Sequence, residues 1–198
     1  MLETGGGGTN GRAPTYEDGA LLGNDAEFFL YGGMMARPVN SPDPEGDQVL
    51  YYEKYQYGPE RPLNQPFNYK ALGENMTRYI TYGGAASAPS ENLAWYFSGM
   101  QSASKGKIYK PGSNLNGSFD ATYVSDTLIT LDMARQRFET FTNASLAPQI
   151  HGRANPELVW VPVGRRGVLV ALGGVVYPDF AFANVTSGDE EASVSVPI

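Results

Sequence analysis

Three stretches of the chain repeat one pattern: an extended segment, a tight polar turn, an apolar segment and then glycine. They span residues 19–34, 81–100 and 158–175. The turns contain residues that accept positive φ or preset a turn, as β-hairpins require. These turn residues are Gly23-Asn24-Asp25, Pro89-Ser90-Glu91-Asn92 and Gly164-Arg165-Arg166-Gly167. The pattern predicts three β-hairpins in succession.

The second segment of each hairpin is apolar on both faces and ends at glycine. The three segments read EFFLY, NLAWYF and VLVAL. Such strands are expected inside sheets that are covered on both sides. We expect this second strand to lie closest to the axis of a radial array, where glycine removes side chains and permits positive φ. The glycines that define the repeat are Gly32, Gly33, Gly99, Gly173 and Gly174.

Further strand candidates lie between the hairpins. With the hairpins they give about four strands per unit, which is the number in one propeller blade. Residues 131–138 have some helical character, but the segment is short, so we expect a turn between strands. The polar insertions 38–48 and 105–120 are expected to be surface loops. The additional strand candidates are 48–57, 67–72, 125–133 and 137–143.

Composition agrees with an all-β chain and excludes several kinds of site. The 198 residues include 13 Tyr, 9 Phe, 24 Gly and 14 Pro, a mixture that favours short strands and turns. The absence of cysteine excludes disulfides, thiolate metal sites and cysteine nucleophiles. The net charge of −7 disfavours nucleic acid and anionic membranes as partners, and Arg165-Arg166 is interpreted as a solvated turn. The apolar run 167–177 is shorter than the roughly 20 residues of a membrane span.

The glycine-terminated hairpins resemble Kelch repeats, in which an apolar strand ends in Gly-Gly. FFLYGG (28–33) and LVALGG (169–174) match this element, whereas WYFSGM (95–100) has Ser98 in place of the first glycine. The family pattern continues with a strand that ends near Asp and an aromatic residue about six positions later. Asp132 and Phe138 match this second element, with Phe where the family usually has Trp.

The chain resembles the Kelch-repeat proteins of filamentous fungi, and the resemblance covers about residues 14–182. The first unit departs from the pattern, since VLYYEKYQY lacks the Asp. The resemblance implies an all-β, Kelch-type β-propeller segment of about three blades of four-stranded antiparallel sheets. Closed propellers have four to eight blades, so we expect an incomplete propeller whose remaining blades belong to a longer protein. Residues 1–13 are expected to be a flexible Gly-rich lead-in, and 183–198 an irregular tail or the start of a truncated blade.

The sequence contains few candidates for catalysis. The galactose oxidase type of Kelch propeller holds copper with two His and two Tyr, one Tyr bonded to Cys. This chain has no Cys and one histidine, His151, so that site cannot be assembled from it. His151 is interpreted as a solvated or locally hydrogen-bonded loop residue. We find no Gly-x-Ser-x-Gly nucleophile motif, and the Gly-rich start lacks the Lys-Ser/Thr of a phosphate-binding loop. We therefore expect no catalytic residue, cofactor or metal.

Two further groups of residues are interpreted as structural or solvated. The acidic residues are expected to be solvated charges in loops, because their spacing is not that of a calcium loop. They are Asp43, Glu45, Asp47, Glu190 and Glu191. The tyrosines of the first unit are expected to pack between blades more than to form a ligand platform. They are Tyr51, Tyr52, Tyr55 and Tyr57.

Four Asn-x-Ser/Thr sequons exceed the one or two expected by chance. They begin at Asn75, Asn116, Asn143 and Asn184. Such sequons accept N-glycans on proteins that pass through the secretory route. The sequons favour an extracellular or cell-surface glycoprotein, and the resemblance implies that a membrane anchor in the full-length form is possible.

These observations favour a non-catalytic binding or scaffold module whose working surface is formed by the loops at one end of the blades. Its ligand would be a protein or a glycan, with no nucleic acid and no direct membrane insertion by this segment. The alternative is a portion of a propeller enzyme, an oxidoreductase or a glycan-active enzyme, with its catalytic residues in other blades. A third possibility is an adhesive wall glycoprotein without a discrete ligand. Propellers support many activities, so the fold alone does not choose between them.

Overall fold

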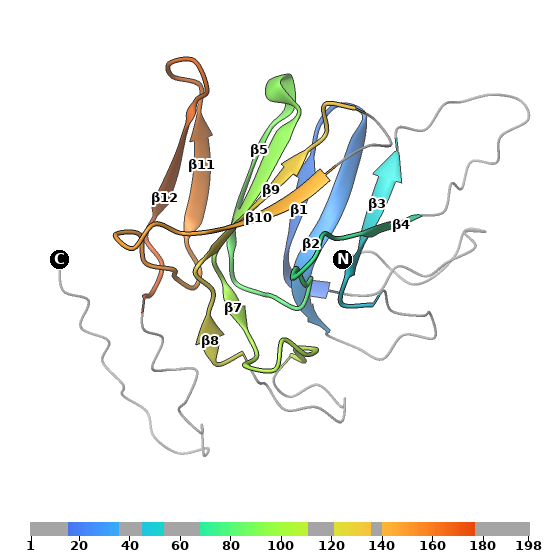
Figure 1. Ribbon diagram of the computed structural model, residues 1–198, viewed down its shortest axis with the longest axis vertical. Helices are drawn as coiled ribbons and strands as arrows, with labels where there is room; N and C mark the ends of the chain where they lie inside the picture. The colour runs from blue at the N-terminus through green and yellow to red at the C-terminus, as the bar shows by residue number, and fades with distance from the viewer. Residues whose placement is uncertain (1–15, 36–44, 54–67, 111–120, 136–139, 177–198) are drawn as a thin grey trace, which may run out of the picture.

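The chain is an all-β protein in the computed structural model, which describes residues 16–35, 45–53, 68–110, 121–135 and 140–176. These residues form twelve strands and one 3-10 helix, η1 (Pro89–Glu91), and they contain no α-helix. Figure 1 shows the hairpin turns β1–β2, β5–β6 and β11–β12 at the same end of the molecule. The predicted fold class is therefore confirmed at the level of all-β architecture.

The first sheet is a four-stranded antiparallel meander in chain order. It consists of β1 (Tyr16–Gly23), β2 (Glu27–Met35), β3 (Gln48–Glu53) and β4 (Asn68–Ala71). The β1–β2 turn is closed by Asn24, whose Oδ1 accepts the N–H groups of Ala26 and Glu27 at 2.8 and 3.0 Å. This is the local hydrogen bonding for which asparagine is favoured in turns.

The second sheet repeats the same meander further along the chain. Its strands are β5 (Gly84–Ala88), β6 (Leu93–Phe97), β9 (Thr127–Asp132) and β10 (Thr140–Ser145). The β5–β6 turn contains η1 and ends at Asn92, which adopts the left-handed conformation with φ 54°. Between β6 and β9, the short strands β7 (Met100–Gln101) and β8 (Tyr123–Val124) pair in a small sheet of their own.

A third hairpin follows, formed by β11 (Glu157–Val161) and β12 (Val168–Leu172). It is a two-stranded sheet within the described part of the chain. The three hairpins predicted from the sequence are therefore confirmed. The prediction of four strands per unit is confirmed for the first two units. All of the described sheets are open. The arrangement of such sheets into a Kelch-type propeller remains a prediction.

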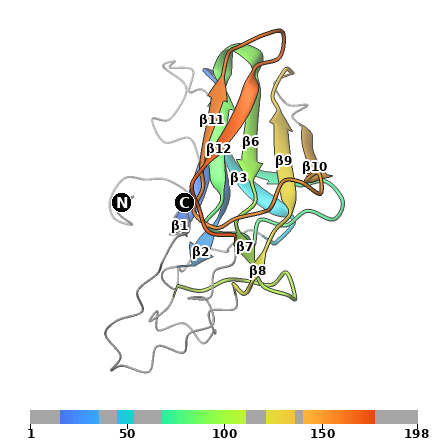
Figure 2. The same cartoon turned by 90° about the vertical axis from the view of Figure 1, so that its left-hand side faces the viewer.

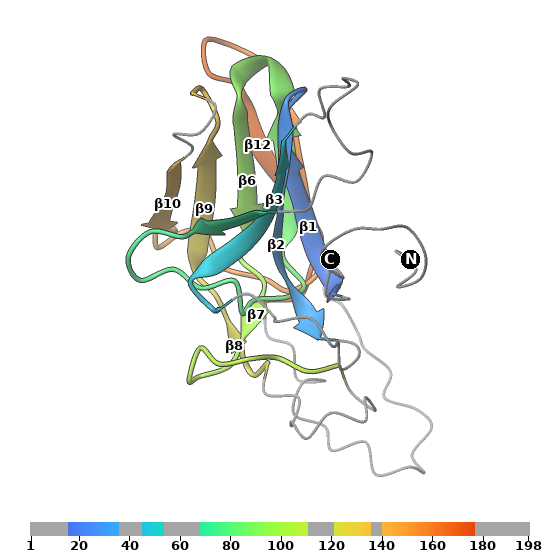
Figure 3. The same ribbon diagram turned by 90° about the vertical axis from the view of Figure 1, so that its right-hand side faces the viewer.

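The second sheet lies between the other two, and β6 is buried on both of its faces. Ala94 and Tyr96 pack with residues of the first sheet, whereas Trp95 and Phe97 pack with residues of the third hairpin. Figures 2 and 3 show the stack from its two sides, with β11 and β12 nearest in one view and β1, β2 and β3 in the other. The prediction that an apolar second strand is covered on both sides is confirmed for β6. It is wrong for β2 and β12, since Phe28, Val168 and Leu172 are exposed.

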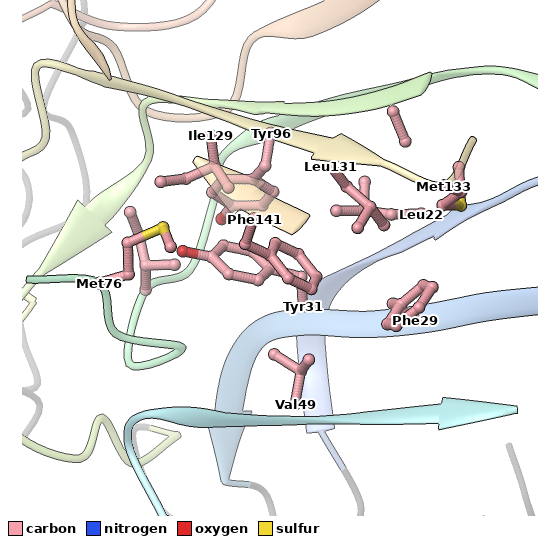
Figure 4. Close-up of a cluster of buried hydrophobic side chains, with 12 residues drawn as sticks. Leu22, Phe29, Tyr31, Val49, Met76, Tyr96, Ile129, Leu131, Met133 and Phe141 are labelled. Atoms are coloured by element: carbon pink, nitrogen blue, oxygen red, sulfur yellow. The ribbon is translucent and has the colours of Figure 1, made fainter. Parts of the chain in front are cut away.

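The larger core lies between the first two sheets and is rich in aromatic side chains (Figure 4). Tyr31 lies beside Tyr96 and Phe141, with ring centroids 5.0 and 6.0 Å apart. The rings of Phe29 and Phe141 are nearly perpendicular, with centroids 5.6 Å apart. Rings in these arrangements add to the stabilisation that their buried area already provides. Leu22, Val49, Met76, Ile80, Ala94, Ile129, Leu131 and Met133 complete the cluster.

The expectation that the second strands of neighbouring hairpins crowd one another, as they would at the axis of a radial array, is wrong. Successive sheets approach through their first strands, since β1 lies against β5 and β5 against β11. The first strands carry small residues at these contacts: a Cβ atom on Gly84 would lie 2.9 Å from the Pro156 carbonyl oxygen. The second strands carry large aromatic side chains, which hold neighbouring backbones apart.

Several smaller expectations fall partly outside the described residues. Of the segment 131–138, for which we expected a turn and no helix, the first two residues belong to β9 (Thr127–Asp132), and the chain bends after them. The described part of the segment is therefore not helical. The predicted lead-in (1–13), the tail (183–198) and Asp43 lie outside the described residues. Within the described ranges, no helix is long and apolar enough to cross a membrane.

Candidate binding rim at the glycine end

The glycines that follow the second strands gather at one end of the sheets, opposite the hairpin turns. We call this the glycine end, and the opposite end the turn end. All five repeat-defining glycines have positive φ, between 62° and 98°. A side chain is strained in this conformation, which explains why the pattern ends on glycine. The five residues are Gly32, Gly33, Gly99, Gly173 and Gly174.

In each hairpin, one of these glycines, which we call the corner glycine, stands opposite a second left-handed residue that lies in the first strand or just before it. The pairings on either side place Asp18 opposite Gly33, Tyr82 opposite Gly99 and Asn155 opposite Gly174. These three residues have φ values of 56°, 56° and 52°. The three hairpins therefore bend at one equivalent point, and the repeat extends to backbone conformation.

The corners also connect each hairpin to the next one. The Gly33 N–H donates to the Ile80 carbonyl at 2.7 Å, and the Gly99 N–H donates to the Arg153 carbonyl at 3.1 Å. Ile80 precedes β5, and Arg153 precedes β11, by the same number of residues. One hydrogen bond is thus repeated at both junctions, which fixes the relative height of successive sheets.

Ser98 replaces the first glycine of the second pair and adds a side-chain link at that junction. It is fully buried and left-handed, with φ 55°. Its Oγ donates to the Ser125 carbonyl at 2.6 Å and accepts the Arg153 N–H at 2.7 Å. The departure from Gly-Gly is therefore compensated by two hydrogen bonds that only a hydroxyl at this place can make.

Polar side chains surround the corners of the first two hairpins. Lys110 forms an ion pair with Glu17 at 2.5 Å, and both side chains are about half exposed. Burial and the neighbouring Glu17 raise the pKa of Asp18, while Lys110 opposes the shift. Burial, followed by the charges of Asp18 and Glu17, raises the pKa of Tyr82. Together with Asn155 these residues form what we call the corner rim: Glu17, Asp18, Tyr82, Lys110 and Asn155.

The rim is held by backbone hydrogen bonds between neighbouring corners. The Asn155 N–H donates to the Tyr82 carbonyl at 2.7 Å, and Thr81 Oγ1 donates to the Asp18 carbonyl at 3.4 Å. Lys110 is positioned by the end of β2, because its N–H donates to the Met35 carbonyl at 2.9 Å. The rim is therefore a surface whose backbone geometry is set by the scaffold.

A second small core supports the rim from below. It joins the end of β2 to the residues that surround β7 and β8. The Met35 N–H donates to the Ile108 carbonyl at 2.9 Å, which ties residues 108–110 to the first sheet. The buried members of this cluster are Met34, Met100, Ile108, Ala121 and Ala154.

The other residues singled out in the sequence are not members of the corner rim. Asn75 is exposed, and Asn143 is exposed on β10, an outer strand of the second sheet. Asn116 and Asn184 lie outside the described residues. His151 is exposed in the connection between β10 and β11, which agrees with its interpretation as a solvated loop residue. Arg165 and Arg166 are exposed in the β11–β12 turn.

The tyrosines of β3 pack against β2. Tyr52 stacks on Phe28 with ring centroids 4.7 Å apart, and Tyr51 stacks on Phe29 at 5.5 Å. Tyr51 also packs against the core between the first two sheets, as expected for packing between units. Tyr52 contacts a neighbouring strand of its own sheet, while Tyr55 and Tyr57 lie outside the described residues.

The acidic segment before β3 contributes backbone contacts. The Glu45 carbonyl accepts the Gln48 N–H at 3.0 Å, and the Asp47 carbonyl accepts the Leu72 N–H at 2.7 Å. Among the residues that the structure describes, no three His, Cys, Asp or Glu side chains are grouped as a metal site would need. The two backbone contacts give this segment a structural role.

The three left-handed residues of the rim, Asp18, Tyr82 and Asn155, were not identified from the sequence. Asp and Asn are the non-glycine residues that most readily adopt positive φ, so Asp18 and Asn155 carried a usable signal. Tyr82 carries none of its own, but it precedes Gly83-Gly84 and stands opposite Gly99 in the hairpin register. Counting back from each corner glycine across the turn would have found all three.

Comparison of the chain with protein-family models and with curated proteins finds no match. The Kelch resemblance and the fungal origin therefore remain predictions from the sequence, and the all-β sheet stack is what the structure establishes.

Proposed function

We propose that this chain is a non-catalytic binding module of the Kelch-propeller type, with the corner rim as its binding surface. The observation that carries the proposal is the equivalence of Asp18, Tyr82 and Asn155. These residues occupy the same left-handed corner of three successive hairpins and place three different polar groups along one edge. Binding surfaces of this kind are commonly presented by a rigid β scaffold.

The chemistry of the rim favours a ligand that offers hydrogen-bond donors. Glu17 and Asp18 provide carboxylate oxygens, Asn155 an amide and Tyr82 a phenol with an aromatic face. Hydroxyl groups of a glycan and amino groups of a protein segment both match acceptors of this type. Because the backbone of the rim is already fixed by hydrogen bonds, little conformational entropy is lost when a ligand binds.

A binding screen tests this proposal. The purified chain is applied to an array of immobilised glycans and of peptides from extracellular proteins. The comparison is a triple variant with Asp18→Asn, Tyr82→Phe and Asn155→Gly. Asparagine and glycine accept positive φ, and phenylalanine keeps the ring, so the variant retains the scaffold. We expect the triple variant to lose at least about tenfold in affinity for the selected ligand.

The matched control removes charge at the turn end, with Arg165→Ser and Arg166→Ser. These arginines lie at the opposite end of the sheets from the rim, so the control should bind as the wild type does. The proposal is wrong if the triple variant binds like the wild type, or if the wild type binds nothing on the array. Turnover of the selected ligand would favour the enzyme alternative instead.

We also propose that the protein passes through the secretory route and carries glycans. Asn75 and Asn143 are both exposed and both begin sequons, so both are accessible for modification in the folded chain. Expression through the secretory route of a fungal host should give a chain whose electrophoretic mobility increases after enzymatic removal of glycans. Asn75→Gln and Asn143→Gln should each remove part of that shift. A mobility that is unchanged by deglycosylation would refute the assignment.

A further inference from the structure

The stack of sheets has two apolar outer faces. On the third hairpin, Val168 and Leu172 are 49 % and 54 % exposed, and Val159 and Val170 pair on the same face. The exposed Glu157 pairs with Leu172 and forms a charged edge of this face at the glycine end. On the first sheet, Leu21 and Phe28 are 62 % and 39 % exposed. Leu30 and Tyr52 stand beside them in the register. Leu50 pairs with Leu30 on this face and is buried, so the exposed part of the face lies toward β1 and the turn end. Apolar faces of paired strands are usually covered in a stable protein.

The packing inside the chain shows what kind of surface fits these faces. The first sheet uses one face to contact the second sheet, and the second sheet uses its other face to contact the third hairpin. Every sheet therefore meets its successor in the same order. The outer face of the third hairpin is the next surface in this series, and the outer face of the first sheet is the surface that a preceding unit would contact.

We propose that two copies of this chain associate head to tail, so that the outer face of each third hairpin packs on the outer face of the partner's first sheet. Two such contacts, related by a two-fold axis, would close a ring of six hairpin-bearing sheets, three from each copy, with the small β7–β8 sheets outside this count. This number lies within the four to eight blades of closed propellers. A head-to-tail contact leads to a closed assembly when its rotation closes. The contact would continue the interface that already joins the sheets within the chain.

Charge at the turn end supports the same pairing. Within the chain, the turn of the first hairpin meets that of the second, since Asn24 Nδ2 donates to Asn92 Oδ1 at 2.9 Å. The same alignment between copies would place the third turn, with Arg165 and Arg166, beside the partner copy's first turn. That first turn carries the exposed Asp25. Opposite charges at a rim of this kind favour one register of association.

The molar mass in solution tests the proposal, with light scattering coupled to size-exclusion chromatography over a range of concentrations. We expect twice the chain mass of 21.4 kDa at micromolar concentration. In a Val168→Asp/Leu172→Asp variant, the dissociation constant of the dimer should rise at least about 100-fold, because the interface would bury unpaired charges. Leu21→Asp/Phe28→Asp should have the same effect from the other face. These side chains are exposed in the single chain, so near-ultraviolet circular dichroism should show that both variants stay folded.

Ile150→Asp is the matched control. Ile150 is 50 % exposed, as are the face residues, but it lies in the connection between β10 and β11. This variant should associate as the wild type does.

Mixing the two face variants distinguishes a head-to-tail contact from a contact between like faces. In the mixture, one of the two interfaces joins two intact faces, so a mixed dimer should form although neither variant dimerises alone. Contact between like faces would leave one of the two variants associating normally.

A charge exchange tests the register. Arg165→Glu/Arg166→Glu should weaken association about two- to fivefold, and Asp25→Lys in the same chain should restore it. A monomeric wild type, or an assembly that persists in both face variants, would overturn the proposal.

Discussion

Left-handed residues decide where each hairpin bends, and their cost differs from one position to another. Gly99 combines a φ of 92° with close approach, since a Cβ atom there would lie 2.6 Å from the Thr81 carbonyl oxygen. Gly164, in the β11–β12 turn, has a φ of 68° with nothing within 4 Å of such an atom. The same substitution at these two positions therefore separates the energetic cost of positive φ from the cost of steric crowding.

Gly99→Ala should lower the free energy of unfolding by about 3 kcal/mol, because it adds a backbone clash to the strain of positive φ. Gly164→Ala should cost about 1 kcal/mol, the strain alone. Denaturant unfolding with an unchanged m-value measures both. Equal costs at the two positions would show that the Gly99 corner is not crowded.

Two buried tyrosines should give the protein a stability limit at alkaline pH. Burial raises the pKa of both Tyr31 and Tyr96 above the ordinary value of 10.0. Tyr31 donates to the Thr77 carbonyl at 2.9 Å, a bond that needs the phenol proton. Tyr96 accepts the Gly83 N–H at 2.9 Å, which opposes the rise of its pKa without cancelling it.

The unfolded chain therefore loses these protons near pH 10, and the folded chain loses them at higher pH. The contribution of these two phenols to the free energy of unfolding should be constant below that pH and should fall as the pH rises above it. Ultraviolet titration of tyrosinate during unfolding checks this: Tyr31→Phe/Tyr96→Phe should reduce the decline. An undiminished decline would assign it to other groups.

At the scale of elements, the junction between the second sheet and the third hairpin depends on one hydroxyl. Ser98 Oγ joins Ser125 and Arg153 across this junction. Ser98→Ala should cost about 2 to 3 kcal/mol, because it leaves both backbone groups without their partner. Ser98→Gly loses the same bonds but relieves about 1 kcal/mol of positive-φ strain. Its unfolding free energy should lie between those of the wild type and the alanine variant; an alanine variant as stable as the wild type would contradict this role.

The elements themselves were largely predictable, for identifiable reasons. Glycine, asparagine and proline mark the three hairpin turns, and the double-sided apolar pattern of NLAWYF predicted the burial of β6 correctly. The prediction that neighbouring sheets approach through their second strands was wrong, because a strand pattern shows which faces are buried but not which neighbour lies closest. Small residues such as Gly84, where a Cβ would approach Pro156, decide that distance.

The candidate site was less predictable than the fold. Asp18, Tyr82 and Asn155 share no residue type, and they are united only by hairpin register and backbone conformation. Glu17 and Lys110 lie 93 positions apart in the chain and meet because residues 108–110 return to the end of β2. Contacts between segments so distant in sequence leave no local pattern.

At the scale of the whole molecule, the account depends on one junction that is used twice. Gly33 donates to Ile80, and Gly99 donates to Arg153, at equivalent places in successive units. Both the binding rim and the head-to-tail association assume that the sheets follow one another by this rule. The junction therefore ties the geometry of single residues to the order of the sheets.

Scalar couplings across hydrogen bonds, measured by NMR on the isotopically labelled chain, test this junction most directly. The account predicts a coupling from the Gly33 nitrogen to the Ile80 carbonyl carbon and another from the Gly99 nitrogen to the Arg153 carbonyl carbon. Both amide protons should also exchange slowly with solvent. Rapid exchange at both glycines, with neither coupling detected, would contradict the repeated junction.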